Sequence, residues 1–483
     1  MDINFFATYQ CNSRCMNCSI WKGEKNNNAG EKLGLEALES LFMSPLVQKT
    51  DLIGIAGGEP TIDPFFWKLL KAVPASKKIT ITTNGLKHEK LMEFLRGQSD
   101  RERFLVQVSI DGIKDLNDKI RGVSGGFQKA VDLLAQLKDI NVQSLISFTI
   151  NRKNYHQIMD VYKLSSKYHA GFSTRMAYCG GAYDNLENRA LFEFDDDELE
   201  TLGKSIVQII NMELEKEDHN SALLVFWDQI VDCYKDKKKQ RKIPCKAMES
   251  GVVIDLYGEV FPNCPVLMEK KLGNIKHKDI DHILNGIQAV SLKAFIEKFK
   301  CGGCWNDCQV VTNINQSGKF LYDEYNKIKM RKFQDAIKFP ETIDFSLDNF
   351  PFLLSGWHSL EKKNEFGFRW TEPKFALPVP SNTIAIEMFV SVPKFIVRSK
   401  NARITIQIDN MDSVSASIKT SEWQKIRITL PCKVNKTIIG NILINGCFCP
   451  GEHGESGDFR KLGMAVNSIH FMKNLCCKKI IDR

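Results

Sequence analysis

Three cysteines near the start of the chain have the spacing of ligands for an iron-sulfur cluster. Cys11, Cys15 and Cys18 stand in the run Cys-Asn-Ser-Arg-Cys-Met-Asn-Cys, directly after the apolar segment 3–9. A 4Fe-4S cluster has four irons, so three thiolates leave the fourth iron open to a small molecule. A structural zinc site is the alternative, but zinc prefers four ligands close together, and the next cysteine or histidine is His88.

A second element follows the apolar run at 51–56 and has the sequence Gly57-Gly58-Glu59-Pro60. An apolar run that ends at paired glycines indicates a buried parallel strand followed by a loop in which the backbone is approached closely. Taken alone, this element would be an ordinary turn, so its meaning depends on the segments around it.

Strand and helix patterns alternate over roughly the first 190 residues. Further strands are predicted at 78–85, 105–112, 142–151 and 172–178, with helices at 35–42, 125–139 and 153–167. Alternation of this kind implies parallel strands joined by right-handed crossovers. We therefore predict an α/β fold, a partial (β/α)6 barrel, with its chemistry at the carboxyl ends of the strands. Asn84, Ser109 and Asp111 lie at such ends.

Together these elements resemble the radical S-adenosylmethionine (SAM) superfamily. The resemblance implies that Cys11, Cys15 and Cys18 hold a 4Fe-4S cluster whose free iron chelates SAM, and that reduction of SAM yields a 5′-deoxyadenosyl radical. It also implies SAM contacts for eight residues: Gly57, Gly58, Glu59 and Pro60 near the ammonium, then Asn84, Ser109, Asp111 and Arg121. Asn17 departs from the superfamily, in which the residue before the last cysteine is often aromatic and lies near the adenine.

A second group of cysteines follows, at Cys245, Cys264, Cys301, Cys304 and Cys308. A hairpin turning at Tyr257-Gly258 is predicted between the first two, and a helix at 287–299 precedes a loop with the last three. This segment resembles the SPASM/Twitch extension of radical SAM enzymes, which implies one auxiliary 4Fe-4S cluster. The first four cysteines form the preferred ligand set, with Cys308 as a substitute ligand or a bystander. A zinc knuckle is the alternative.

From about residue 345 onward the sequence alternates with period two between short turns, which predicts an all-β antiparallel sandwich. Its Trp, Phe and Gly-Asp-Phe-Arg landmarks are similar to a sandwich appended to enzymes of bacterial polysaccharide assembly. Glycan binding and simple packing of these tryptophans both remain open. The predicted domains are 1–235 for the barrel, 236–338 for the Twitch-like module and 345–475 for the sandwich.

The resemblances imply hydrogen abstraction from a carbohydrate-containing substrate in polysaccharide biosynthesis, supported by an external one-electron reductant of flavodoxin or ferredoxin type. Oxidation with electron transfer to the auxiliary cluster is the first expectation. The alternatives are epimerisation, with Cys179 at the end of the sixth strand as hydrogen donor, and modification of a ribosomally made peptide. A buried, inert Cys179 is the simpler reading of that residue.

Composition sets further bounds. The 483 residues are 43% hydrophobic and 26% charged, with a net charge of +8, as in an ordinary soluble protein. Neither a membrane-spanning run nor a basic secretory start is present, so we expect a cytoplasmic protein with reduced thiols. The basic run 235–242 lacks interleaved aromatic residues, which favours a solvated linker over nucleic-acid binding.

Overall fold

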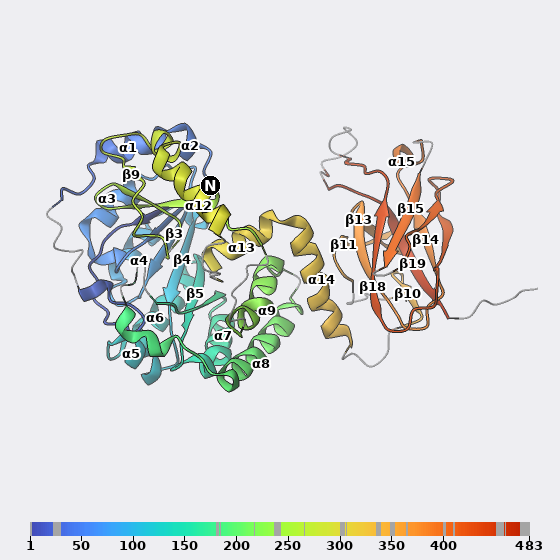
Figure 1. The fold of residues 1–483 in the computed structure, drawn as a ribbon, viewed down its shortest axis with the longest axis horizontal. Helices are drawn as coiled ribbons and strands as arrows, with labels where there is room; N and C mark the ends of the chain where they lie inside the picture. The colour runs from blue at the N-terminus through green and yellow to red at the C-terminus, as the bar shows by residue number, and fades with distance from the viewer. Residues whose placement is uncertain are drawn as a thin grey trace, which may run out of the picture. The chain divides into compact units, whose positions relative to one another are not determined.

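The chain forms two compact units, Met1–Gly318 and Lys319–Arg483 (Figure 1). The structure is a computed structural model. It describes every residue except 1, 23–29, 180–182, 184, 217, 236–242, 265, 300–304, 306, 335–339, 348–352, 364–365, 399–401, 409–410, 451–457, 459 and 474–483. The predicted linker at 235–242 therefore lies almost wholly outside the described residues.

Unit one is built on a nine-stranded sheet with the order β6-β5-β4-β3-β2-β1-β7-β8-β9. Strands β1 to β7 all run parallel to one another, whereas β8 pairs antiparallel with β7, and β9 pairs antiparallel with β8. The strands are β1 (Asp2–Phe6), β2 (Leu52–Ala56), β3 (Lys78–Thr83), β4 (Phe104–Ser109), β5 (Gln143–Ile150), β6 (Gly171–Met176), β7 (Gly251–Asp255), β8 (Glu259–Pro262) and β9 (Gly273–Asn274).

The parallel strands have one apolar face and one polar face. On β3, Ile79 and Ile81 are fully buried, whereas Thr80 and Thr82, which alternate with them, line a cavity. β4 repeats the pattern, with Val106 and Val108 buried and Gln107 and Ser109 in the cavity. Because successive side chains of a strand point to opposite faces, this alternation assigns one face to packing and the other to the cavity.

Helices cover the apolar face, as Figure 1 shows for α3, α4 and α6 around the strands. α6 contacts β4 and β5, and α7 contacts β5 and β6. The helices between and after the parallel strands are α1 (Leu35–Met43), α2 (Pro45–Gln48), α3 (Pro64–Ala72), α4 (Glu89–Arg96), α5 (Asp115–Arg121), α6 (Gly126–Asp139), α7 (Ile158–Lys167), α8 (Asp196–Glu213) and α9 (Ser221–Lys235).

The six predicted strands and the helices between them are present as a parallel α/β sheet. The barrel is not confirmed: among the described strands the sheet is open, and its end strands β6 and β9 do not pair with each other. The predicted hairpin at 251–264 is confirmed, with β7 and β8 joined at Gly258, whose φ is 88°. β7 pairs with β1, so this hairpin extends the sheet itself rather than forming a separate body.

The rest of the cysteine-rich segment is helical in its described parts. It contains α10 (Ala247–Ser250), α11 (Ile280–Leu284), α12 (Ile287–Phe299) and α13 (Asp307–Gln316). Trp305, just before α13, is buried, stacks on Phe226 of α9 and donates its indole N–H to the Phe226 carbonyl at 2.9 Å. All of this segment up to residue 318 belongs to unit one.

Unit two begins with α14 (Gly318–Gln334) and forms the predicted antiparallel sheets. One sheet has the order β11-β12-β19-β14-β17, with β10 also paired to β19, and the other has the order β13-β18-β15-β16. Its elements are β10 (Thr342–Asp344), β11 (Trp357–Lys363), β12 (Phe366–Thr371), β13 (Lys374–Val379), β14 (Ala385–Ser391), α15 (Lys394–Arg398), β15 (Arg403–Ile408), β16 (Val414–Ser417), β17 (Gln424–Thr429), β18 (Ile438–Ile444) and β19 (Ala465–Met472). Both sheets contribute to one hydrophobic core that includes Phe375, Ile386, Ile442 and Phe471.

None of the described helices combines the length and apolar character needed to cross a bilayer.

The Gly57-Gly58 loop packs directly against the backbone before Cys11. We call the segment that carries Cys11, Cys15 and Cys18 the first cysteine loop. The Gly58 N–H donates to the Thr8 carbonyl at 2.7 Å, and the Glu59 N–H donates to the Gln10 carbonyl at 2.8 Å. A Cβ on Gly58 would lie 2.0 Å from the Gln10 carbonyl oxygen, which no side chain tolerates. Gly57 has φ +146°, and a Cβ there would meet the Thr8 carbonyl at 2.5 Å.

We expect Gly58→Ala to separate these two loops, because the added methyl group meets backbone rather than a flexible side chain. The free energy of unfolding should fall by about 1–3 kcal/mol, the usual cost of overpacking. The iron bound after anaerobic reconstitution should fall with it. Gly34→Ala is the matched control, since nothing lies within 4 Å of its added Cβ. A Gly58→Ala protein with wild-type stability and iron content would contradict this packing.

Candidate active site

A cavity of about 400 Å³ opens on the polar face of the sheet. Three sources contribute to its wall: the first cysteine loop, the carboxyl ends of the parallel strands and the segment after β8. Nine of the predicted site residues line it, namely Cys11, Cys15, Cys18, Gly57, Gly58, Ser109, Asp111, Arg121 and Cys264. The cavity thus brings together residues that are up to about 250 positions apart in the sequence.

The first cysteine loop is held by backbone hydrogen bonds to the end of α5. The Arg14 N–H donates to the Arg121 carbonyl at 2.9 Å, and the Met16 N–H donates to the Ile120 carbonyl at 2.8 Å. Gly122 permits this approach, since it has φ +66° and a Cβ there would lie 2.6 Å from the Arg14 carbonyl. The segment that carries Cys15 is therefore fixed against the helix that supplies Arg121.

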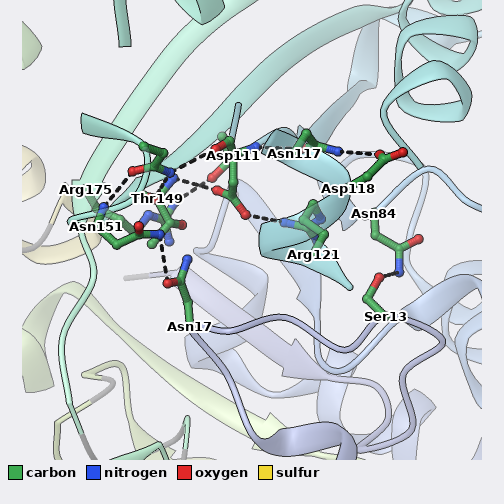
Figure 2. Close-up of polar contacts among 12 residues, drawn as sticks. Ser13, Asn17, Asn84, Asp111, Asn117, Asp118, Arg121, Thr149, Asn151 and Arg175 are labelled. Atoms are coloured by element: carbon green, nitrogen blue, oxygen red, sulfur yellow. Dashed lines mark hydrogen bonds and ion pairs between the residues drawn. The ribbon is translucent and has the colours of Figure 1, made fainter. Parts of the chain in front are cut away.

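Asn84 fixes the other side of this loop (Figure 2). Its buried side-chain amide donates to Asn12 Oδ1 at 2.7 Å and to Ser13 Oγ at 3.0 Å, and its Oδ1 accepts from the Leu86 N–H at 3.0 Å. Asn84 is not among the described cavity-lining residues. Its position supports a role in orienting the cysteine loop, while the predicted contact with SAM stays a prediction.

Asn17, where an aromatic residue was the usual expectation, lines the cavity and joins two other segments to the cysteine loop. Its Oδ1 accepts from Asn151 Nδ2 at 3.0 Å, just after β5, and its carbonyl accepts from Asn185 Nδ2 at 2.6 Å. Figure 2 shows the contact with Asn151. The polar side chain at this position thus ties the cysteine loop to the end of β5, a role that the spacing of the cysteines did not reveal.

The three thiols of the first loop are close neighbours in a water-poor site. Burial, together with the nearby thiol of Cys15, raises the pKa of Cys11 to about 11, and burial with both neighbouring thiols raises the pKa of Cys18 to about 12. Among the described residues, no three His, Cys, Asp or Glu side chains converge to hold one single ion. A 4Fe-4S cluster has a different requirement, because each thiolate binds a different iron. Three adjacent thiols facing one cavity fit that group.

Glu59 is buried, and its carboxylate accepts hydrogen bonds from neighbouring residues. Its Oε1 accepts from Thr61 Oγ1 at 2.7 Å and from Thr83 Oγ1 at 2.8 Å, and its Oε2 accepts from the Asn84 N–H at 2.7 Å. Burial raises the pKa of this carboxyl group, while these donors act to lower it. Glu59 and Pro60 are not among the described cavity-lining residues. Glu59 therefore acts here as a cap that fixes the glycine loop and Asn84.

Asp111 and Arg121 form an ion pair at the cavity wall, with Arg121 Nη1 2.7 Å from Asp111 Oδ2 (Figure 2). Their side chains are 3% and 15% exposed, respectively. Burial opposes the charge of Arg121, but Cys15 and Asp111 outweigh it and raise its pKa. The other Asp111 oxygen accepts from the Thr149 N–H at 2.9 Å. This pair places a fixed cation beside the cysteines, where a carboxylate could bind.

The second cysteine group is only partly described. Cys264 is buried and lines the same cavity as the first group, whereas Cys245 is partly buried and is not among the lining residues. Cys301 and Cys304 lie outside the described residues. Cys308 falls in the first turn of α13 rather than in the predicted loop. The position of Cys264 brings the auxiliary module to the edge of the catalytic cavity.

Three side-chain contacts connect that module with the cysteine loop and with β6. Tyr9, just before the first cysteine, donates to Asp255 of β7 at 2.9 Å. Arg175 of β6 pairs with Asp307 of α13 at 3.1 Å, and Ser173 Oγ donates to the same carboxylate oxygen at 3.1 Å. The module is therefore tied to the sheet on both sides of the cavity.

Arg175 is the main residue of the cavity that the sequence reasoning missed. It lies on β6 in the cavity wall, and its Nη2 donates to Ser147 Oγ of β5 at 3.2 Å. A charged residue within the predicted strand 172–178, one position before the buried Met176, was the signal that could have identified it. Tyr178 and Tyr183 also line the cavity and were not predicted.

Cys179 does not reach this cavity in the described structure. It is partly buried, and its Sγ lies 3.7 Å from the Asn185 carbonyl, to which it donates a weak hydrogen bond. Its predicted role as a hydrogen donor stays a prediction.

We expect Asn84→Ala to make the cysteine loop more mobile without unfolding the protein, because Asn12 Oδ1 and Ser13 Oγ both lose their hydrogen-bond donor. Leaving such groups unpaired costs about 1–3 kcal/mol. Part of that cost should appear as lower iron occupancy and roughly tenfold weaker SAM binding by equilibrium dialysis. Asn285→Ala, which removes an exposed contact to the Asp281 carbonyl, is the control. Unchanged iron and SAM binding in Asn84→Ala would refute the role given to Asn84.

Two family models match the chain. The model of the radical SAM superfamily matches residues 6–165, and the SPASM model, an iron-sulfur cluster-binding domain, matches residues 245–309. Both matches fall on the segments that form the cavity wall.

Relatives and solved structures match over part of the chain. Mycofactocin maturase MftC of Mycobacterium tuberculosis is 31% identical over 166 residues, which are 34% of this chain and 41% of that protein. The sporulation killing factor maturation protein SkfB of Bacillus subtilis is 28% identical over 160 residues, 32% of this chain and 38% of that protein. The chain thus spans about two fifths of the length of these curated relatives.

Among solved structures, SuiB of Streptococcus suis bound to S-adenosylmethionine has a TM-score of 0.47 and 17% identity, covering 61% of this chain and 68% of SuiB. The family models carry the assignment: the chain contains a radical SAM domain at residues 6–165, whose cofactors are a 4Fe-4S cluster and SAM, and a SPASM domain for auxiliary iron-sulfur binding at residues 245–309.

Proposed function

We propose that this protein is a radical SAM enzyme that oxidises a hydroxylated carbon of a carbohydrate-containing substrate. The observation that carries the proposal is the position of Cys264, which lines the same cavity as Cys11, Cys15 and Cys18. An auxiliary cluster at that position would stand beside the substrate and accept the electron that an oxidation releases. External electrons would come from a reductant of flavodoxin or ferredoxin type.

The lining of the cavity supports a hydroxylated substrate. Apolar residues such as Phe6, Leu52 and Val253 form part of its wall, but six of the strand residues that line it carry neutral hydroxyl or amide groups: Asn4, Thr80, Thr82, Gln107, Ser147 and Thr149. Such groups donate and accept hydrogen bonds without a fixed charge, which matches the hydroxyl groups of a sugar. Arg175 adds one cation, held in place by Asp307 and Ser147.

The remaining residues have supporting roles. When bound, the cluster and SAM supply a carbon-centred radical that abstracts hydrogen. Arg121, fixed by Asp111, would receive the SAM carboxylate, and the carbonyl groups of Gly57 and Gly58 would receive its ammonium. Asn17, Tyr178 and Tyr183 complete the wall and would limit the orientations open to SAM and substrate.

Cys264→Ser tests the oxidative role. We expect the iron content to fall by about four atoms per chain, because one 4Fe-4S cluster loses a ligand. 5′-Deoxyadenosine should still form, while oxidised product should fall at least about tenfold. Cys432→Ser removes an exposed cysteine of unit two and is the control. Full product formation by Cys264→Ser would contradict an electron-accepting cluster at this position.

Epimerisation is the alternative outcome, and the structure favours it less because Cys179 is not among the described residues of the cavity wall. Modification of a peptide is a second candidate, favoured by the two relatives named for maturation. Both alternatives keep the radical chemistry and differ in the fate or the identity of the substrate.

One experiment in deuterated water separates these candidates. Reconstituted protein, SAM and dithionite are incubated with an oligosaccharide fraction or with a peptide fraction from bacterial cells. We expect the oligosaccharides to stimulate 5′-deoxyadenosine release and to give an unlabelled product lighter by two hydrogens. Deuterium in a carbon-bound position, lost in Cys179→Ala, would indicate epimerisation instead. If only the peptide fraction stimulates 5′-deoxyadenosine release, the substrate is a peptide and not a carbohydrate.

A further inference from the structure

Unit two has a cluster of aromatic side chains on the outer face of one sheet. We call this set the aromatic face. All of its members are partly exposed, and none belongs to the hydrophobic core between the two sheets. Its members are Phe366, Phe368 and Trp370 of β12, Phe389 of β14 and Trp423 just before β17.

The pattern of the strands explains why these rings point outward. In β12 the side chains of Phe366, Phe368 and Trp370 alternate with the buried Gly367 and Thr371, so three aromatic rings share one face. Trp357 of β11 differs, because it packs against the core and donates its indole N–H to the Ala376 carbonyl at 2.8 Å. The sandwich thus uses one tryptophan for packing and keeps two in contact with solvent.

Trp423 is the centre of the aromatic face. Its ring centroid lies 4.8 Å from that of Phe366, 5.4 Å from that of Phe389 and 5.8 Å from that of Phe368. Between β12 and β14 runs β19, which places the small Ser468 opposite Phe389. Because the Ser468 side chain is small, it leaves space beside the ring of Phe389 on this face of the sheet.

A set of charged groups borders these rings. Glu361 of β11 is directly opposite Phe368, so its side chain lies on the same face. Arg460 bridges Glu361 at 2.9 Å and Asp458 at 2.7 Å, and both Glu361 and Arg460 keep 38% of their side-chain surface exposed. Aromatic rings therefore lie next to a guanidinium and two carboxylates that are already oriented.

We propose that the aromatic face binds a glycan, with pyranose rings stacked on Trp423 and Trp370 and hydroxyl groups bound by Glu361 and Arg460. A pyranose has C–H groups on its face and hydroxyls on its edge, and it complements an aromatic surface beside fixed donors and acceptors. Glu361 and Arg460 are partly exposed beside the rings, where the hydroxyl edge of a stacked sugar would lie. A protein partner or second copy would meet the same apolar centre and charged border, so it is an outcome of the test below. Binding does not depend on the radical chemistry; only the identity of the glycan as substrate rests on the proposed function.

The test is a glycan array of several hundred bacterial oligosaccharides, probed with the full-length protein in the absence of SAM and reductant. We expect a distinct group of glycans to be retained. Titration of one retained oligosaccharide by calorimetry should show binding at least about tenfold weaker in Trp370→Ala/Trp423→Ala, since each lost stacking partner weakens it several-fold. Arg460→Ala should weaken it by a smaller factor.

Trp67→Ala, which removes a partly exposed tryptophan of α3, is the matched control and should leave glycan binding unchanged. 5′-Deoxyadenosine release should be near wild type in the double variant, because no residue of the aromatic face is among the described residues of the cavity in unit one. If unit two of the double variant fails to fold, Trp423→Phe takes its place, with a smaller loss of affinity. Retention of no glycan, or equal retention by all variants, would overturn the proposal. A dimer that the double variant converts to monomers, without glycan binding, would assign this face to a second copy.

Discussion

The close approach of two backbone segments is the constraint on which the catalytic cavity depends. Gly58 and Glu59 donate hydrogen bonds to the carbonyls of Thr8 and Gln10, and this fixes the start of the cysteine loop against the end of β2. Only glycine allows the approach at position 58. Once the two segments are joined, the buried Glu59 connects them to Thr83 and Asn84, and Asn84 in turn holds the cysteine loop. The cysteine loop is therefore held by backbone contacts and neutral amides, while the charged side chains among the described lining residues are Asp111, Arg121 and Arg175.

The alternation of the parallel strands has an equally direct consequence. A parallel sheet covered by helices on both faces would need apolar side chains on both. Here one face carries Thr80, Gln107 and Thr149, and these residues form part of the wall of the cavity. The hairpin that adds β7 next to β1 then brings Cys264, a member of the second cysteine group, to the same wall as Cys11, Cys15 and Cys18.

Much of the fold and site followed from local sequence. The six strands of the first 180 residues, three of the helices there and the hairpin at Gly258 have short-range patterns of apolar residues and glycines, and these predictions match the observed elements to within a few positions. The helices α3, α4 and α5 were not predicted. The partial (β/α)6 barrel is not confirmed, because the curvature of a sheet depends on packing between distant elements rather than on any local pattern. Arg175 was missed for a related reason: a charged residue in a strand can point to solvent or to a cavity, and only the packing of β6 decides which.

The sequence by itself determined the chemistry, because three thiols at fixed spacing, paired glycines before a glutamate and polar strand ends are properties of neighbouring residues. Only the tertiary structure decided how these groups are used. It placed Glu59 in a buried cap, made Asn17 a link to β5, brought Cys264 to the same cavity as Cys11 and left Cys179 outside its described wall. It also separated Trp357, which packs against the core, from Trp370 and Trp423, which lie on the outer face of the sheet. Each of these outcomes depends on contacts between residues far apart in the chain, which local sequence does not encode.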